Sequence, residues 1–236
     1  MIAKEKTNTY RTTATVVGIV YILGFVVGLV GIGLINSMLG APDHLSTVSA
    51  NSMLLGFAAV LWLMAVIGDA AHGVLMFPIL KQDNERVALG YFGARIVEAT
   101  IIAVSALFIL LQIPLGREFL KASASETSYL QSLSALFTQS QAYTYQIGMV
   151  ALGMAGLTLC YGFYRAKLVP QFFVIWGFIG YVSFLGGSIL EILGFNLQLL
   201  HTIPGGLWEM SIGVWLIAKG FNSSAFVSQS EEASDK

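Results

Sequence analysis

The segment YFGARIVEATIIAVSALFILLQI, residues 91–113, decides the fold because it is apolar enough for a lipid bilayer and nevertheless contains two charges. As an α-helix it would be about 35 Å long, and the hydrocarbon core of a bilayer is about 30 Å thick. Its charged residues, Arg95 and Glu98, are three positions apart and therefore lie on one helix face. Charges at that depth face the interior of a helix bundle and pair there. The segment predicts a membrane helix packed among others.

The composition of the whole chain predicts an integral membrane protein. Of 236 residues, 56% are hydrophobic and 11% are charged, whereas about 25% of residues are charged in a soluble domain. The net charge of −1 provides no basic surface for nucleic acid. The apolar composition makes the lipid bilayer the expected partner. The single cysteine, Cys160, excludes an internal disulfide and a cysteine-based metal cage.

Six apolar stretches have the length of a transmembrane helix, about 20 residues. We therefore predict an all-α, single-domain bundle of six transmembrane helices over residues 13–221. A short cytoplasmic segment, 1–12, would precede it, and a disordered cytoplasmic tail, 222–236, would follow it. The six predicted spans are Thr13–Leu39, Ser52–Leu80, Tyr91–Ile113, Tyr143–Phe163, Val169–Leu193 and Leu199–Ile217.

The connector Pro114–Ala142 is the only long one. Within it, leucine and phenylalanine recur at helical spacing among serine and glutamine, as at Leu130, Leu133 and Phe137. This pattern is typical of an amphipathic helix lying on the outer membrane surface. A plain polar loop is the alternative interpretation.

The distribution of the twelve basic residues predicts that both termini are cytoplasmic. Two of them, Arg117 and Lys121, fall in odd-numbered connectors, and Arg95 lies within a span. The remaining nine lie in the terminal segments or in even-numbered connectors, and cytoplasmic loops are enriched in such residues. These nine are Lys4, Lys6, Arg11, Lys81, Arg86, Arg165, Lys167, Lys219 and Lys236.

Three carboxylates are predicted to lie at one depth near the middle of the membrane. Asp69, Glu98 and Glu209 are each ten or twelve residues from a cytoplasmic basic residue, or about 15 to 18 Å along a helix. Arg95 and His72 are each one turn closer to the cytoplasm, on the same faces as Glu98 and Asp69. These five residues are the candidate site for a proton or ligand.

A second polar level is predicted near the outer boundary, at Asn36, Glu191 and His201. Ten residues of mixed loop separate Glu191 from His201, which is no recognised metal-ligand spacing, so no metal site is predicted. Counting both levels, four membrane acids face one arginine and one histidine. Either some carboxyls are protonated, or a cation or a water-filled cavity occupies the interior.

Three functions are compatible with these residues. The first is a binding or transport module for a proton, a cation or a small polar ligand, which uses the inner five residues. The second is a membrane-embedded enzyme acting on a lipid or lipophilic substrate through Glu191, Glu209 and His201. The third is a structural or sensory partner of another membrane protein, in which Arg95 and Glu98 only tether the bundle and Asp69 with His72 forms a core pair. The sequence specifies no cofactor and no oligomeric state.

Several stretches resemble a bacterial membrane family with six helices that is catalogued as domain of unknown function 4386. They are GIVYILGFVVGL in the first predicted helix, GDAAHGVLMFPILK, GARIVEA, YGFYRAKLVPQFFVIWGFIGY and the closing WEMSIGVWLIAKGF. The resemblance covers about residues 12–221. It implies a multi-helix protein of the bacterial cytoplasmic (inner) membrane, and it carries over neither an activity nor a catalytic residue.

Overall fold

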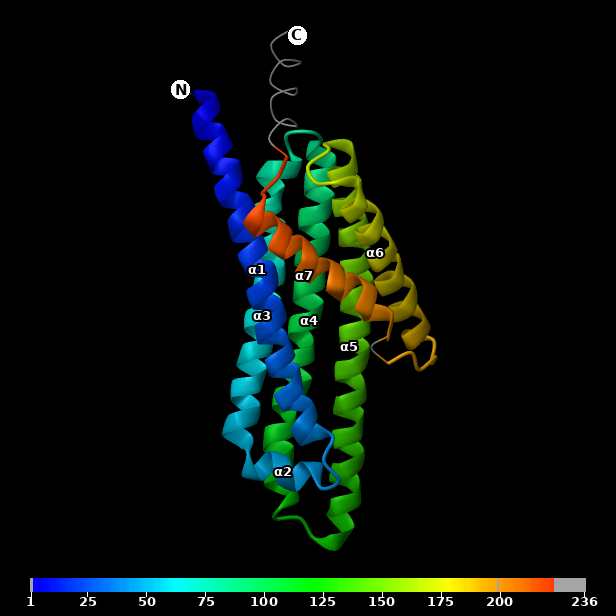
Figure 1. Cartoon of the computed structure of the whole chain (residues 1–236). Coiled ribbons are helices and arrows are strands. Elements are labelled where there is room, and N and C mark those ends of the chain that lie inside the picture. The colour runs from blue at the N-terminus through cyan, green and yellow to red at the C-terminus, as the bar shows by residue number, and fades with distance from the viewer. Residues whose placement is uncertain (1, 199, 223–236) are drawn as a thin grey trace.

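The computed structural model describes residues 2–198 and 200–222, and these residues form helices and short connections without a strand. Figure 1 shows long helices running side by side, with a short helix across one end of the bundle. The predicted tail lies outside the described residues beyond Asn222. The elements are α1 (Ile2–Leu39), α2 (His44–Ala50), α3 (Ser52–Leu80), α4 (Glu85–Phe119), α5 (Ala124–Arg165), α6 (Gln171–Ile192), the 3-10 turn η1 (Leu200–Thr202) and α7 (Ile203–Ala218).

The long helices form a closed ring. Each of α1, α3, α4, α5, α6 and α7 packs against the next, and α7 returns to pack against α1. At this closure Gly18 lies so close to Gly213 that a Cβ atom would come within 2.5 Å of the Gly213 carbonyl oxygen. Arg11 donates to the Ile217 and Ala218 carbonyls at 2.8 and 3.1 Å, which fastens α1 to the end of α7. The ring therefore encloses an interior to which six helices contribute.

Five helices are long and apolar enough to cross a membrane: α3, α4, α5, α6 and the part of α1 from Tyr10. The chain is thus an all-α protein with several candidate membrane spans, as predicted. The predicted sixth span corresponds to α7, which has 16 residues and is shorter than the other five.

The prediction for Pro114–Ala142 was wrong, because neither a surface helix nor a loop fills this connector. α4 continues through Pro114 to Phe119, and α5 begins at Ala124 and runs unbroken to Arg165. A capping box starts α5: the Ser123 backbone N–H donates to Glu126 Oε2 at 2.8 Å. The two helices form a long hairpin that extends beyond α6 in Figure 1.

Polar side chains hold this hairpin together, which explains why its amphipathic pattern was misleading. The buried Ser134 hydroxyl donates to Gln112 Oε1 at 2.7 Å, and Gln112 Nε2 donates to the Ser134 carbonyl and to Thr138 Oγ1, both at 3.1 Å. His44 Nε2 lies 2.9 Å from Ser134 Oγ and adds α2 to the same group. The face of α5 that packs against α4 here is therefore partly polar and also carries Phe137, which packs against Phe108, whereas Leu136 is exposed.

Candidate functional site

Arg95 on α4 is the centre of a charged cluster inside the ring. Its NH2 atom lies 2.7 Å from Asp69 Oδ1 on α3, and its NH1 atom lies 2.9 Å from Glu98 Oε2 one turn along α4. Its Nε atom donates to the Asp69 carbonyl oxygen at 3.0 Å. Gly73 allows α3 and α4 to approach here, since a Cβ atom at this position would be 3.1 Å from Arg95 Cβ. The guanidinium thus joins the two predicted carboxylates.

The members of this cluster differ in exposure. The side chains of Arg95 and Glu98 are 4% and 1% exposed, whereas that of Asp69 is 38% exposed. Asp69 therefore has accessible surface in the folded chain, whereas Glu98 has almost none. Glu98 Oε2 also has no hydrogen-bond partner among the described residues, so charge rather than a well-directed hydrogen bond holds it to Arg95.

Glu209 on α7 is the third carboxylate of the interior. Tyr181 on α6 donates its hydroxyl to Glu209 Oε1 at 3.0 Å. Glu209 also lies within electrostatic range of Arg95 and Asp69. No basic side chain of the described residues forms an ion pair with it. The structure therefore brings Asp69, Glu98 and Glu209 into one electrostatic group, while only the first two contact the guanidinium.

His72 does not form the hydrogen-bonded core pair with Asp69 that was one of the two interpretations of the sequence. Its side chain is buried, and neither ring nitrogen has a hydrogen-bond partner among the described residues. The ring instead packs against Tyr21 of α1, with 3.7 Å between the ring centroids. At least one imidazole nitrogen carries a hydrogen, so His72 brings an unused donor or acceptor to the edge of the cluster.

Four tyrosines that were not predicted as site residues surround the cluster: Tyr21, Tyr91, Tyr145 and Tyr181. Tyr21 interacts electrostatically with Tyr91, Tyr181 and Glu209. Tyr145 is within electrostatic range of all three carboxylates. Their positions in the sequence could have identified them, because Tyr91 lies one turn before Arg95 and the other three fall inside predicted spans. Tyrosine in a membrane helix is commonly assigned to the aromatic belt, which hid this pattern.

The outer-level residues do not form one group. His201 is buried, with its Nε2 atom 3.5 Å from Ser188 Oγ. Glu191 Oε1 accepts the Leu197 N–H at 2.6 Å. Asn36 is exposed near the end of α1, which lies farther along the bundle than the end of α6 (Figure 1). In the described part of the chain, no three His, Cys, Asp or Glu residues gather as a metal site.

A family model described as "Domain of unknown function (DUF4386)" matches residues 16–220, which confirms the resemblance drawn from the sequence. No match to a curated protein or to a solved structure was found.

Proposed function

The chain belongs to the family of domain of unknown function 4386, and we propose that it is a membrane binding or transport module that takes up a proton or small cation in its charged interior. Arg95, Asp69, Glu98 and Glu209 would form the site, with His72 beside it. This proposal rests on the charges, because the family carries no assigned activity.

The observation that carries the proposal is the imbalance of charge. Three carboxylates lie near one guanidinium and two of them contact it, which leaves a surplus of two negative charges if all three are ionised. An unpaired charge in a membrane interior costs at least about 2.5 to 3.5 kcal/mol on insertion scales. A bound proton or cation removes this cost. The site therefore gains stability by binding positive charge, which is the property that a cation or proton carrier requires.

The groups around the carboxylates are suited to proton transfer. The Tyr181 hydroxyl contacts Glu209 directly, and Tyr21 connects Tyr181 with Tyr91, which interacts with Arg95 and Glu98. Hydroxyl and imidazole groups both donate and accept hydrogen bonds, so they can pass a proton along such a series. Asp69 would be the entry group because it is the accessible carboxylate.

We further propose six spans, with both termini in the bacterial cytoplasm. At 1.5 Å per residue α7 is about 24 Å long, and the 3-10 turn before it adds about 6 Å. End to end they are about as long as a hydrocarbon core is thick, about 30 Å, and α7 runs obliquely to α3, α4 and α5 in Figure 1. The start of α1 and the end of α7 lie at the same end of the bundle (Figure 1), and this arrangement fits the distribution of basic residues.

Purified protein in liposomes tests the transport proposal. Vesicles would be given a membrane potential, and proton entry would be followed with an enclosed pH-sensitive dye and sodium entry, in separate vesicles, with an enclosed sodium-sensitive dye. Wild-type protein should carry one of the two ions faster than empty vesicles, and Glu209→Gln should lose that flux. Glu118→Gln is the matched control, because Glu118 is exposed at the end of α4. Wild-type flux equal to that of empty vesicles for both ions would reject transport and favour a purely structural cluster.

A second candidate function, a membrane-embedded hydrolase, is favoured by one contact. Ser188 Oγ lies 3.5 Å from His201 Nε2, and Glu191 is close enough to His201 to interact with it. Ser188 is fully buried, so a lipid substrate would have to displace packed side chains. Labelling by a serine-directed fluorophosphonate probe, abolished by Ser188→Ala and by His201→Gln, would support this candidate. Absence of labelling in the wild type would reject it.

A further inference from the structure

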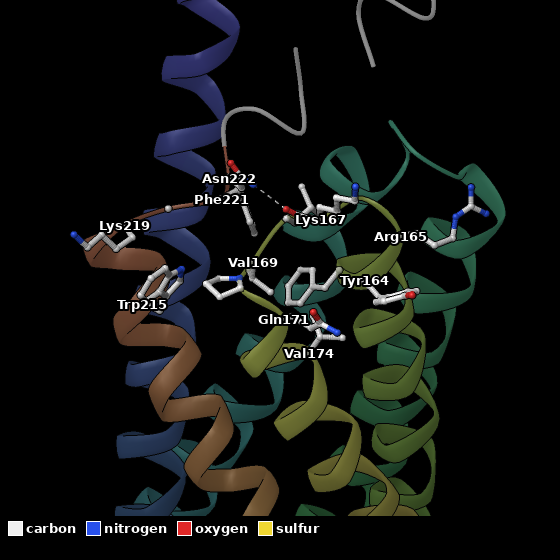
Figure 2. Close-up of a pocket in the computed structure, with 14 residues that line it drawn as sticks. Tyr164, Arg165, Lys167, Val169, Gln171, Val174, Trp215, Lys219, Phe221 and Asn222 are labelled. Carbon is white, nitrogen blue, oxygen red and sulfur yellow. Dashed lines mark hydrogen bonds between the residues drawn. The ribbon is translucent and has the colours of Figure 1, made fainter. Parts of the chain in front are cut away.

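A cleft of about 830 Å³ lies between the turn that joins α5 to α6 and the residues that end α7 (Figure 2). It is far from the Arg95 cluster in sequence and lies at the end of the bundle where α1 begins. Large apolar side chains form much of its wall, among them Phe163, Val174 and Trp215. The cleft therefore offers an apolar surface at the end of the membrane helices, where a bilayer meets water.

The polar part of the cleft is positively charged. Arg165, Lys167 and Lys219 are among its lining residues, and no aspartate or glutamate is. Arg165 is partly neutralised by Asp83, whose Oδ2 lies 3.3 Å from Arg165 Nε. Lys167 and Lys219 form no ion pair with a described residue, and in Figure 2 their side chains point away from each other at the rim of the cleft. Two ammonium groups thus remain to attract an anion.

The two sides of the cleft are fixed to each other. The Asn222 backbone N–H donates to the Leu168 carbonyl at 2.8 Å, and its side-chain amide donates to the Lys167 carbonyl at 3.3 Å. Lys167 has a left-handed backbone, with φ of 52°, which ends α5 and turns the chain into the lip of the cleft. The indole N–H of Trp215 in the wall has no acceptor among the described residues. The site is thus preformed and retains an unused donor.

We propose that this cleft binds an anionic phospholipid, with an acyl chain against the apolar wall and the phosphate at the rim, toward which the flexible side chains of Lys167 and Lys219 turn on binding. The positive charge of the two lysines favours an anionic headgroup. Each lysine near a membrane surface strengthens binding to anionic lipids by up to about tenfold. The apolar wall selects a lipid over free phosphate, because a small soluble anion would leave that wall unused. This inference does not depend on the proposed transport function.

Thermal unfolding in a neutral detergent tests the site, because a ligand that binds the folded protein raises its Tm. Phosphatidylglycerol, phosphatidylcholine with the same acyl chains and inorganic phosphate would be titrated separately. The test variant is Lys167→Asn with Lys219→Gln; asparagine tolerates the left-handed backbone at position 167. The control variant is Lys81→Gln with Lys121→Gln, which removes two exposed lysines elsewhere.

Phosphatidylglycerol should raise the wild-type Tm more than phosphatidylcholine does. Its half-saturating concentration should increase about tenfold or more in the test variant and change less than twofold in the control variant. Equal effects of the two lipids would overturn the proposal, as would equal losses in the two variants. Full stabilisation by inorganic phosphate alone would assign the cleft to a soluble anion and would also overturn it.

Discussion

The guanidinium of Arg95 and the carboxylate of Glu98 form a buried ion pair across one turn of α4, with 2.9 Å between NH1 and Oε2. Removing two such charges from water costs several kcal/mol per ion, which their attraction must offset. Arg95 also contacts Asp69 on α3 and thereby connects two helices. Loss of the arginine would leave two carboxylates without an ion-pair partner. Loss of Glu98 leaves no acid unpaired in this way, because Arg95 remains paired with Asp69.

This asymmetry predicts the outcome of a double-mutant cycle. Arg95→Gln should lower the free energy of unfolding by about 3 to 5 kcal/mol, the usual cost of breaking a buried pair from one side. Adding Glu98→Gln should restore part of that loss, because one stranded charge disappears. Unfolding of the four proteins by denaturant in detergent measures the coupling. Arg86→Gln, an exposed position on the same helix, should change stability by less than about 0.5 kcal/mol. Additive losses at Arg95 and Glu98 would show that the two side chains do not interact.

The difference in exposure between Asp69 and Glu98 predicts different access from water. Asp69→Cys should react with a membrane-impermeant, water-soluble thiol reagent, whereas Glu98→Cys should react at least about tenfold more slowly, because thiol reactivity follows exposure and the thiolate form. The native Cys160 is buried and should give little background. Mass spectrometry of the labelled protein gives both rates. An unreactive Asp69→Cys would mean that its exposed surface faces lipid, and Asp69 would no longer qualify as the entry group.

The hydrogen bond from Tyr181 to Glu209 predicts a measurable loss on removal of one hydroxyl. Tyr181→Phe keeps the ring and should reduce stability by about 1.5 to 3 kcal/mol if the Glu209 carboxylate is charged, or about 0.5 to 1.5 kcal/mol if it is neutral. Tyr164→Phe, at an exposed ring, is the control and should have little effect. Calorimetric or denaturant unfolding distinguishes the two ranges. A loss of zero would show that the hydroxyl contributes nothing to holding Glu209.

The inner cluster was predictable because membrane depth and helical spacing both follow from residue number. Asp69, Arg95 and Glu98 come together as their spacing indicated. The contribution of the tyrosines was not predictable in this way, since it depends on which faces of α1, α4 and α6 turn inward. The separation of Asn36 from Glu191 has a similar cause: α6 is 22 residues long while α1 has 38, so residues assigned to one outer level lie at different heights.

The long hairpin of α4 and α5 was missed for a different reason. Sequence patterns identify a helix by its apolar face, but these two helices also pack through polar side chains, those of Gln112, Ser134 and Thr138. Pro114 also appeared to end the span, although proline is tolerated in membrane helices whose freed backbone groups find other partners. The apolar residues that recur in this stretch include the exposed Leu136, so their periodicity indicated a helix on the membrane surface instead of a helix packed against α4.

The proposed topology places the α4–α5 turn and the end of the chain on opposite sides of the membrane. A periplasm-dependent reporter inserted into the turn at Ala122 should be active, and the same reporter fused after Lys236 should be silent. A cytoplasm-dependent reporter should give the opposite pattern at both sites. Activity of the periplasmic reporter at both positions would require an odd number of spans and would remove α7 from the membrane.

The contact between Gly156 on α5 and Tyr181 on α6 predicts that one methyl group will disturb the cluster from a distance. A Cβ atom at Gly156 would collide with the Tyr181 ring, whereas one at Gly186 on α6 would meet nothing within 4 Å. Gly156→Ala should therefore cost about 1 to 3 kcal/mol through overpacking. Gly186→Ala should be neutral or stabilising by up to about 1 kcal/mol, because alanine favours a helix.

The Gly156→Ala and Gly186→Ala variants also distinguish an effect on helix packing from an effect on the position of the Tyr181 hydroxyl. If Gly156→Ala displaces the Tyr181 hydroxyl from Glu209, then Tyr181→Phe should cost less in the Gly156→Ala protein than in the wild type, and any ion flux should fall. In the Gly186→Ala protein, Tyr181→Phe should retain its full cost. Unfolding of these six proteins, together with flux in liposomes, provides the measurement. Equal costs of Tyr181→Phe in all three backgrounds would show that Gly156 supports the fold without positioning Tyr181 on Glu209.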